Sequence, residues 1–333
     1  MKNILKMQSV RKLIFLALTF AIIQLLIITN IIDAYFQNTL ANICINIILA
    51  VSLNLITGFT GQFSLGHAGF MSIGAYTCAI ITLRMPTILG FFLGVLAGAV
   101  LAALVGFIVG LPTLRLRGDY LAIATLGMAE IIRIIFINLK ITNGAAGLQN
   151  IPRFVNWTWL FIFTVGTVLL INNFLKSSHG RACIAIREDE IAADAMGINT
   201  TKYKVTAFVI GAFCAGIAGA LYASYFYFLK PNIFDFLKSV NVLVIVVLGG
   251  LGSISGSIFA AILLEIISTF LQSFSELRMV IYALLLVIIM IFRPQGLMGS
   301  KEVSFSVFSK LGGNFKSGKS KLEQRFKSKK GRV

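Results

Sequence analysis

Charged side chains are scarce in this sequence. Asp, Glu, Lys and Arg make up 12% of its 333 residues, roughly half of their share in a soluble domain. Hydrophobic residues make up 58%, and the mean hydropathy is +0.92. A water-soluble protein of this length needs polar side chains over most of its surface, and this chain has too few of them. The composition therefore predicts a polytopic, all-α membrane protein.

Histidine and cysteine are also few, although most metal and redox sites need them. The two histidines, His67 and His179, form no H-E-x-x-H pair, and the sequence has no G-x-S-x-G serine. These absences argue against an intramembrane enzyme. The four cysteines show no CxxC spacing, so we expect neither disulfides nor a metal site. Acids within apolar segments are essentially Glu130 and Glu265, which argues against a proton-coupled carrier.

Basic residues outnumber acidic residues by 29 to 12, and many of them lie at the C-terminal end of the chain. Residues 301–333 contain ten Lys or Arg and only Glu302 and Glu323. This tail has neither aromatic platforms nor a folded basic module, so it does not indicate nucleic-acid binding. We interpret residues 1–300 as a transmembrane domain and residues 301–333 as a disordered cytoplasmic tail beside anionic membrane lipid.

Nine apolar segments approach the roughly 20 residues that a membrane-spanning helix needs. They are 13–32, 39–57, 65–83, 88–112, 119–138, 158–175, 205–228, 240–271 and 279–293. The eighth is too long for a single crossing and contains a glycine-rich stretch, so we expect it to form two helices. The first segment follows basic residues, as in a signal peptide, but it is long and has no small-residue cleavage site. It is therefore interpreted as a retained helix.

The distribution of basic residues supports the division of segment 240–271. Four Lys or Arg precede the first segment and predict a cytoplasmic N-terminus. Alternation then places the basic loops at 115–117 and 176–204 in the cytoplasm. The basic tail lies on that same side only if the number of crossings is even. Nine crossings would place the tail outside, whereas the division gives about ten.

Small residues interrupt the apolar pattern in both halves of the chain. The first interruption contains Gly58, Gly61, Ser64, Gly66, His67 and Gly69, and the second contains Gly249, Gly250, Gly252 and Ser253. Broken helices at membrane depth occur only where they are buried in protein or line a cavity, and paired breaks indicate a transport pathway. Tight helix packing is the alternative explanation. We expect His67 to be a hydrogen-bonded core residue rather than a proton relay or metal ligand.

The fifth apolar segment carries charged residues. Glu130 and Arg133 are three residues apart on a predicted helix, so they share a face and can form an ion pair. Charges within a membrane span face the protein interior or a cavity. A structural ion pair that holds helices in register is the alternative. Asp119, at the start of the segment, is expected to cap the helix.

The long loop at 176–204 contains a predicted short surface helix. Its residues include Arg187, Glu188, Asp189, Glu190, Ala192, Ala193 and Gly197. Acids at its start complement the helix dipole, and Gly197 fits a helix end. Ala192, Ala193, Ala195 and Met196 form a small apolar face that is suited to docking into a groove on a soluble partner. A loop helix that lies on the protein itself is the alternative.

Five stretches of the chain, in this order, resemble the LivM-type permeases of branched-chain amino-acid ABC transporters. They are Gly61–Phe70, Leu116–Tyr120 with Thr125–Gly127, Arg187–Gly197, Val247–Ser253 and Phe292–Leu297. The resemblance implies a transport subunit in the cytoplasmic membrane of a bacterium, with no catalytic centre and no bound cofactor. Its cargo would be leucine, isoleucine or valine. Its partners would be a second related permease, two cytoplasmic ATPases that use ATP and Mg²⁺, and an extracytoplasmic binding protein.

The resemblance also assigns roles to two regions. Residues 188–197 match the coupling loop of bacterial ABC importers, E-A-A-x-x-x-G, although Ile191 stands where that motif has Glu. The helix ends at the two interruptions would bind the ammonium and carboxylate groups of the cargo transiently. Related permeases for urea or short-chain amides share these motifs, and an ion-coupled carrier or channel is the remote alternative.

Overall fold

The computed structural model describes residues 2–29, 31–114, 116, 118–271, 280, 281, 284, 287 and 296–299. The α-helices are α1 (Lys2–Ile28), α2 (Ala34–Asn54), α3 (His67–Arg84), α4 (Ile88–Thr113), α5 (Asp119–Asn138), α6 (Trp157–Lys176), α7 (Ser178–Glu188), α8 (Glu190–Ala195), α9 (Thr200–Phe226), α10 (Phe236–Gly249) and α11 (Ile254–Phe270). A π-helical turn, η1 (Leu55–Phe59), continues α2, and 3₁₀ turns form η2 (Lys140–Thr142), η3 (Gly144–Ala146) and η4 (Pro231–Phe234). The all-α prediction is confirmed.

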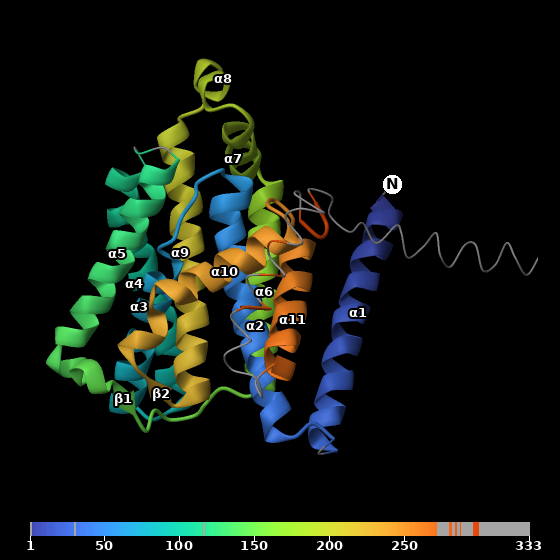
Figure 1. Ribbon diagram of the computed structural model, residues 1–333. Helices are drawn as coiled ribbons and strands as arrows, with labels where there is room; N and C mark the ends of the chain where they lie inside the picture. The colour runs from blue at the N-terminus through green and yellow to red at the C-terminus, as the bar shows by residue number, and fades with distance from the viewer. Residues whose placement is uncertain are drawn as a thin grey trace, which may run out of the picture. The chain divides into compact units, whose positions relative to one another are not determined.

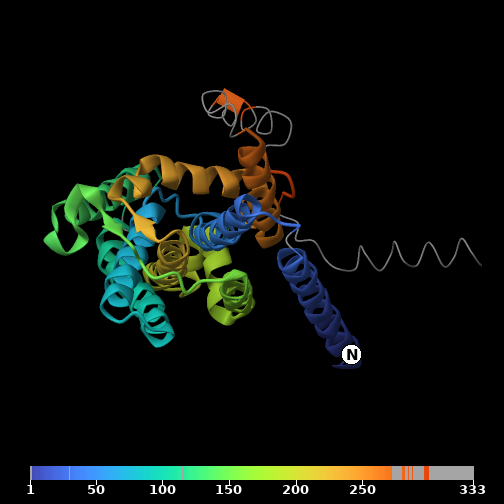
Figure 2. The ribbon, with the colours of Figure 1, turned by 90° about the horizontal axis from the view of Figure 1, so that it is seen from below.

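Most of the long helices run side by side, whereas α10 lies across them (Figures 1 and 2). Five helical segments are long and apolar enough to cross a membrane: Ala34–Phe59, Ile88–Thr113, Asp119–Asn138, Trp157–Lys176 and Thr200–Phe226. Shorter apolar helices include α10 and α11. The 14 residues of α10 span about 21 Å at 1.5 Å per residue. This length is less than the roughly 30 Å of a bilayer core, so α10 is a half-helix.

The tightest packing in the bundle joins α9 to α3 and α4. A Cβ added at Gly74 of α3 would lie 2.5 Å from the Cα of Gly216 of α9, and one added at Gly98 of α4 would lie 3.1 Å from the Cα of Gly74. Glycine therefore lets these three backbones touch, as small residues do between membrane helices. Phe70 and Phe208 pack edge to face beside this contact, with ring centroids 5.4 Å apart.

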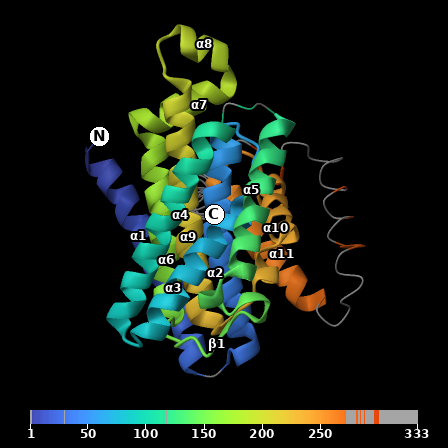
Figure 3. The same cartoon turned by 90° about the vertical axis from the view of Figure 1, so that its left-hand side faces the viewer.

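The two ends of the bundle are built differently. At one end α8 projects beyond α7 (Figures 1 and 3). At the other end β1 (Leu148–Gln149) pairs with β2 (Phe228–Leu229) in an antiparallel register that places Leu148 opposite Leu229. The N-terminal end of α1 lies toward the α7 end (Figure 1).

The predicted division of segment 240–271 is confirmed, because α10 ends at Gly249 and α11 begins at Ile254. The first interruption is shorter than expected. Gly58 belongs to the π-helical turn, and His67 and Gly69 belong to α3, so the non-helical backbone runs only from Thr60 to Gly66. Most of segment 279–293, the arginines at 115 and 117, and the tail 301–333 lie outside the described residues.

Candidate functional site

The first break, residues 60–66, joins the end of η1 to the start of α3. The segment begins with turns that are wider than those of an α-helix. The Gln62 amide donates to the Ile56 carbonyl over 3.1 Å, and the Thr60 hydroxyl donates to the Leu55 carbonyl over 2.7 Å. Gly61 has a φ of +73°, a conformation that glycine adopts without steric cost. The π-turn and this glycine therefore end the helix that α2 begins. Thr60 and Gln62 are both buried, so the protein covers their side chains.

Contacts from three other helices hold the first break. The Gln62 side chain donates to the Lys204 carbonyl of α9 over 3.2 Å, and the Leu65 amide donates to the Thr125 hydroxyl of α5 over 3.1 Å. The Ala68 amide, in the first turn of α3, donates to the Ser239 hydroxyl of α10 over 3.1 Å. Side chains thus satisfy backbone groups that a helix would otherwise pair.

The second break, residues 250–253, is a tight corner between α10 and α11. Gly250 and Gly252 have φ values of +112° and +85°. The two helices cross so closely that a Cβ added at Gly249 would lie 2.5 Å from the carbonyl carbon of Gly256. The Leu297 amide donates to the Leu248 carbonyl over 2.8 Å. Leu297, the last residue of the Phe292–Leu297 motif, therefore caps the C-terminal end of α10.

Asn54, the last residue of α2, bonds the second break and packs against Gly58, just before the first break. Its side-chain oxygen accepts from the Gly252 amide over 2.9 Å, and its nitrogen donates to the Ser253 carbonyl over 2.9 Å and to the Ser257 hydroxyl over 2.8 Å. A Cβ added at Gly58 would collide with the Asn54 side chain and the Gly252 amide. The two interruptions, almost 200 residues apart in sequence, are therefore in direct contact.

Arg187 of α7 lies against both breaks. A Cβ added at Gly61 would lie 3.5 Å from the Cγ of Arg187, and one added at Gly252 would collide with its Nη1. Gly61 and Gly252 thus leave the space that the Arg187 side chain occupies. The structure brings the loop at 176–204 directly to the breaks, a contact that spacing alone did not predict.

The short helix predicted within 188–197 is present as α8, but it begins at Glu190 because Glu188 belongs to the preceding helix. Glu188 ends α7, and Asp189 interrupts the helix and caps α8 by accepting from the Ile191 and Ala192 amides over 2.9 and 3.0 Å. Asp caps a new helix in this way because its short carboxylate satisfies first-turn amides. The prediction that Gly197 ends the helix is confirmed by its φ of +81°.

The exposed surface of α8 differs from the expected apolar face. Ala193 is buried against the protein, whereas Ile191 and Met196 are 74% and 83% exposed. The Glu190 carboxylate forms an ion pair with the Lys204 ammonium of α9, at a distance of 2.7 Å. Ile191, the departure from the E-A-A pattern, is therefore one of two large apolar side chains exposed on α8 and its C-cap.

The predicted ion pair on α5 is present. The Arg133 Nε donates to both carboxylate oxygens of Glu130 over 3.0 Å, and its Nη1 donates to the Asn232 side chain over 3.0 Å. These residues line an open groove of about 590 Å³, together with Leu126, Asp235 and Phe236. The pair is partly exposed in that groove, which fits the rule that charges in a span face a cavity.

Asp119 does not cap α5 as expected. It is the first residue of the helix, Gly118 occupies the capping position with a φ of +57°, and no side-chain cap hydrogen bond forms there. The Asp119 carboxylate can therefore act on α5 only through the helix dipole.

Two further polar contacts lie inside the bundle. His67 is buried and hydrogen-bonded as expected, with its Nε2 2.8 Å from the Ser52 hydroxyl of α2. Asn46 of α2 was not predicted as functional, yet it donates to Glu265 of α11 over 2.9 Å and accepts from Lys238 of α10 over 3.3 Å. The Lys238 side chain therefore reaches into the contact between α2 and α10.

Sequence reasoning missed Asn54 and Asn46. Asparagine within an apolar run was the available signal, since a buried amide needs partners on a neighbouring helix. The sequence predicted the breaks, the ion pair and the surface helix of the 176–204 loop. It did not predict the contact between the breaks and that loop, because this contact depends on how distant helices pack.

Comparison with known proteins gives consistent matches. The family profile described as "Branched-chain amino acid transport system / permease component" matches residues 35–290. The chain is 40% identical over 289 residues to the permease protein LivM of Escherichia coli strain K12, covering 76% of this chain and 68% of the relative. It is 27% identical over 289 residues to LivH of Salmonella typhimurium strain LT2, covering 77% and 92%. No solved structure gives a significant match.

Proposed function

Because the chain belongs to the permease-component family of branched-chain amino-acid transport systems, we propose that it is one membrane subunit of an ATP-driven importer for leucine, isoleucine and valine. Relatives named LivM and LivH both match the chain, which supports pairing with a second, related permease. Two ATPase subunits on the cytoplasmic face would supply ATP hydrolysis with Mg²⁺, and an extracytoplasmic binding protein would deliver the cargo to the cytoplasmic membrane.

The observation that carries the mechanism is the position of Arg187 between the two breaks. Arg187 lies at the end of α7, directly before α8, and its side chain contacts the backbone at Gly61 and Gly252. A displacement of α8 by an ATPase would therefore move a side chain that contacts both breaks. The exposed Ile191 and Met196 are suited to a hydrophobic groove on that ATPase.

The groove beside α5 offers both charges to a zwitterionic cargo. Arg133 would attract the carboxylate of an amino acid, and Glu130 and Asp235 would attract its ammonium group. Leu126 and Phe236 provide apolar surface for an aliphatic side chain. Urea and short-chain amides carry no net charge on either end, so this groove favours the amino-acid cargo over that alternative.

Reconstitution tests the proposal. The chain is co-purified with the subunits that bind its α7–α8 segment and placed in proteoliposomes with the binding protein. We expect uptake of leucine that requires ATP and liganded binding protein, together with stimulated ATP hydrolysis. Uptake that persists without the ATPases would instead identify a carrier or channel. Uptake of urea or acetamide in preference to leucine would identify the alternative cargo.

The contribution of the groove is tested with Glu130→Gln and Arg133→Gln. Each removes one charge, so we expect the KM for leucine uptake to rise about tenfold while basal ATP hydrolysis is kept; one lost charged hydrogen bond corresponds to about 1.5–3 kcal/mol. Arg84→Gln, at the exposed end of α3, is the control. An unchanged KM in both variants would leave Glu130 and Arg133 as a structural ion pair.

A further inference from the structure

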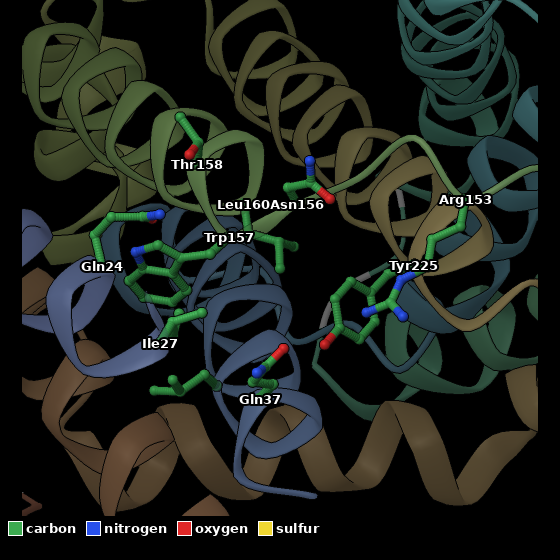
Figure 4. Close-up of a pocket in the computed structure, with 10 residues that line it drawn as sticks. Gln24, Ile27, Gln37, Arg153, Asn156, Trp157, Thr158, Leu160 and Tyr225 are labelled. Atoms are coloured by element: carbon green, nitrogen blue, oxygen red, sulfur yellow. The ribbon is translucent and has the colours of Figure 1, made fainter. Parts of the chain in front are cut away.

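A separate cavity of about 250 Å³ lies between α1, α2, α6 and α9. It is found where α1 and α9 end and where α2 and α6 begin, at the end of the bundle away from α8 (Figure 1). Gln24 of α1 and Trp157 of α6 lie side by side on one side of it, and Arg153 and Tyr225 lie on the other (Figure 4). The groove proposed for the cargo is elsewhere, so no residue is shared between the two.

Two polar atoms at this cavity are buried without a hydrogen-bond partner among the described residues. They are the Gln24 side-chain oxygen and the Trp157 indole nitrogen. The first is an acceptor and the second is a donor. A buried polar group without a partner is costly, and both of these atoms come from residues that line one cavity. The cavity is therefore suited to a group that donates one hydrogen bond and accepts another.

Arg153 adds a positive charge to the same cavity. Its guanidinium carbon lies 4.6 Å from the centroid of the Tyr225 ring, which fixes the side chain over the aromatic face. Arg153 has no carboxylate partner within the described part of the chain. A phosphate group bound here would face the guanidinium on one side of the cavity and the Trp157 N–H on the other (Figure 4).

We propose that this cavity binds the headgroup of a phospholipid that carries hydrogen-bond donors, namely an ethanolamine or a glycerol headgroup. The phosphate oxygens would accept from Arg153 and Trp157, and the ammonium or hydroxyl group would donate to the Gln24 oxygen. A choline headgroup has the same phosphate but no N–H or O–H, so it leaves the Gln24 oxygen unpaired. The site therefore distinguishes between lipids by their hydrogen-bond donors.

Three observations favour a lipid over a free solute. The cavity is smaller than the roughly 300–1,000 Å³ of pockets for drug-sized ligands, so it accommodates a headgroup and leaves the acyl chains outside. On α1, the side chains Ile22, Leu25 and Ile28 next to Gln24 are exposed and form an apolar surface for those acyl chains. Tryptophan at the end of a membrane helix is also typical of the headgroup level of the bilayer.

The bound lipid would fasten α1 to the rest of the bundle. Apart from the cavity, α1 contacts α6 through Phe20 and Phe161, whose ring centroids are 5.3 Å apart. A headgroup that bonds both Gln24 of α1 and Trp157 of α6 adds a polar link between the same two helices.

Native mass spectrometry of the full-length chain, purified with its partner subunits, tests the site. Dioleoyl phosphatidylethanolamine, phosphatidylglycerol and phosphatidylcholine are titrated separately. We expect the ethanolamine and glycerol lipids to bind at least fivefold more tightly than the choline lipid. Gln24→Leu should remove that preference, and Trp157→Phe and Arg153→Gln should weaken binding of all three lipids severalfold, because all three share the phosphate.

Matched controls lie nearby in the chain. Trp159→Phe changes a tryptophan of the same helix that packs on Phe92 instead, and Gln149→Leu changes an exposed glutamine of β1. Both controls should keep the wild-type preference. Equal binding of all three lipids by the wild-type chain, or a preference that survives Gln24→Leu, would overturn the proposal. Displacement of the lipid by millimolar leucine would show that the cavity accepts a free amino acid, and would overturn it too.

Discussion

The two breaks occupy corresponding places in the two halves of the chain, but they are built in different ways. The first is a stretch of seven residues, Thr60 to Gly66, in which Gly61 and Phe63 are exposed and which forms hydrogen bonds to α5 and α9. The second is a corner of four residues, Gly250 to Ser253, in which two helices cross in backbone contact. The first break is held by hydrogen bonds to several helices, whereas the second depends on glycine geometry and on the side chains of Asn54 and Arg187.

This difference predicts different responses to change. A segment held by several separate hydrogen bonds loses them one at a time. A corner at which two backbones are in contact does not tolerate an added side-chain atom, because close-packed membrane helices leave no cavity there to accommodate it. We therefore expect the second break to be the less tolerant of the two, and the predictions that follow test this order.

The largest effect is expected from Gly249→Val. The new Cβ would lie 2.5 Å from the carbonyl of Gly256, and neither backbone can move without separating α10 from α11. Overpacking costs about 1–3 kcal/mol and occasionally more, so we expect loss of leucine uptake and a low yield of monodisperse protein. Gly166→Val is the control, because a Cβ at Gly166 on α6 meets nothing within 4 Å. Normal uptake by Gly249→Val would show that the corner is not close-packed.

At the first break Gly61→Val should act for another reason. A Cβ at Gly61 reaches only ordinary contact distance from Arg187, so the obstacle is the φ of +73° rather than close helix approach. A residue with φ above zero that is not glycine costs about 1–2 kcal/mol. We expect Gly61→Asn, which tolerates this conformation, to retain more uptake than Gly61→Val. Equal losses in both variants would contradict the backbone explanation.

The next effect in size is expected from Asn54→Leu. Leucine has a similar shape but cannot bond the second break, so the Gly252 amide would be left buried without a partner, at a cost of about 1–3 kcal/mol. We expect a lower melting temperature of the detergent-solubilised protein and reduced uptake. Asn138→Leu, at the exposed end of α5, should leave both unchanged. An unchanged melting temperature for Asn54→Leu would mean that the breaks are joined by other contacts.

Much of this arrangement could be predicted from sequence, because it depends on composition along the chain. Glycine and charge parity divided segment 240–271 correctly, and three-residue spacing predicted the Glu130–Arg133 pair. Contacts between distant segments could not be predicted in this way. No periodicity indicates that Asn54 faces Gly252, or that Arg187 fits the space left by two glycines, since both depend on how α2, α7 and α11 pack. The short helix expected within 188–197 is α8, but its start at Glu190 was not predicted, because it depends on the capping carboxylate of Asp189.

Arg187→Gln is expected to affect coupling more than assembly. The variant keeps a polar side chain but removes the guanidinium that lies against Gly252. We expect uptake to fall severalfold while binding of the ATPases and basal ATP hydrolysis persist. Arg181→Gln, on the same helix with its guanidinium bonded to the Lys176 carbonyl, is the matched control. Loss of ATPase binding by Arg187→Gln would instead make Arg187 part of the docking surface.

The smallest effect is expected from Glu190→Lys, which tests the α8 end of the pathway to the breaks. Glu190 pairs with Lys204 at a partly exposed position, and such pairs contribute about 0.2–1 kcal/mol. Charge reversal should therefore reduce ATPase association modestly in a pull-down, through repulsion from Lys204. If the cause is this internal pair, adding Lys204→Glu should restore association. If the double variant remains impaired, the Glu190 carboxylate itself contacts the ATPase. Met196→Glu, which introduces a charge at the exposed tip of α8, should be more damaging than either variant.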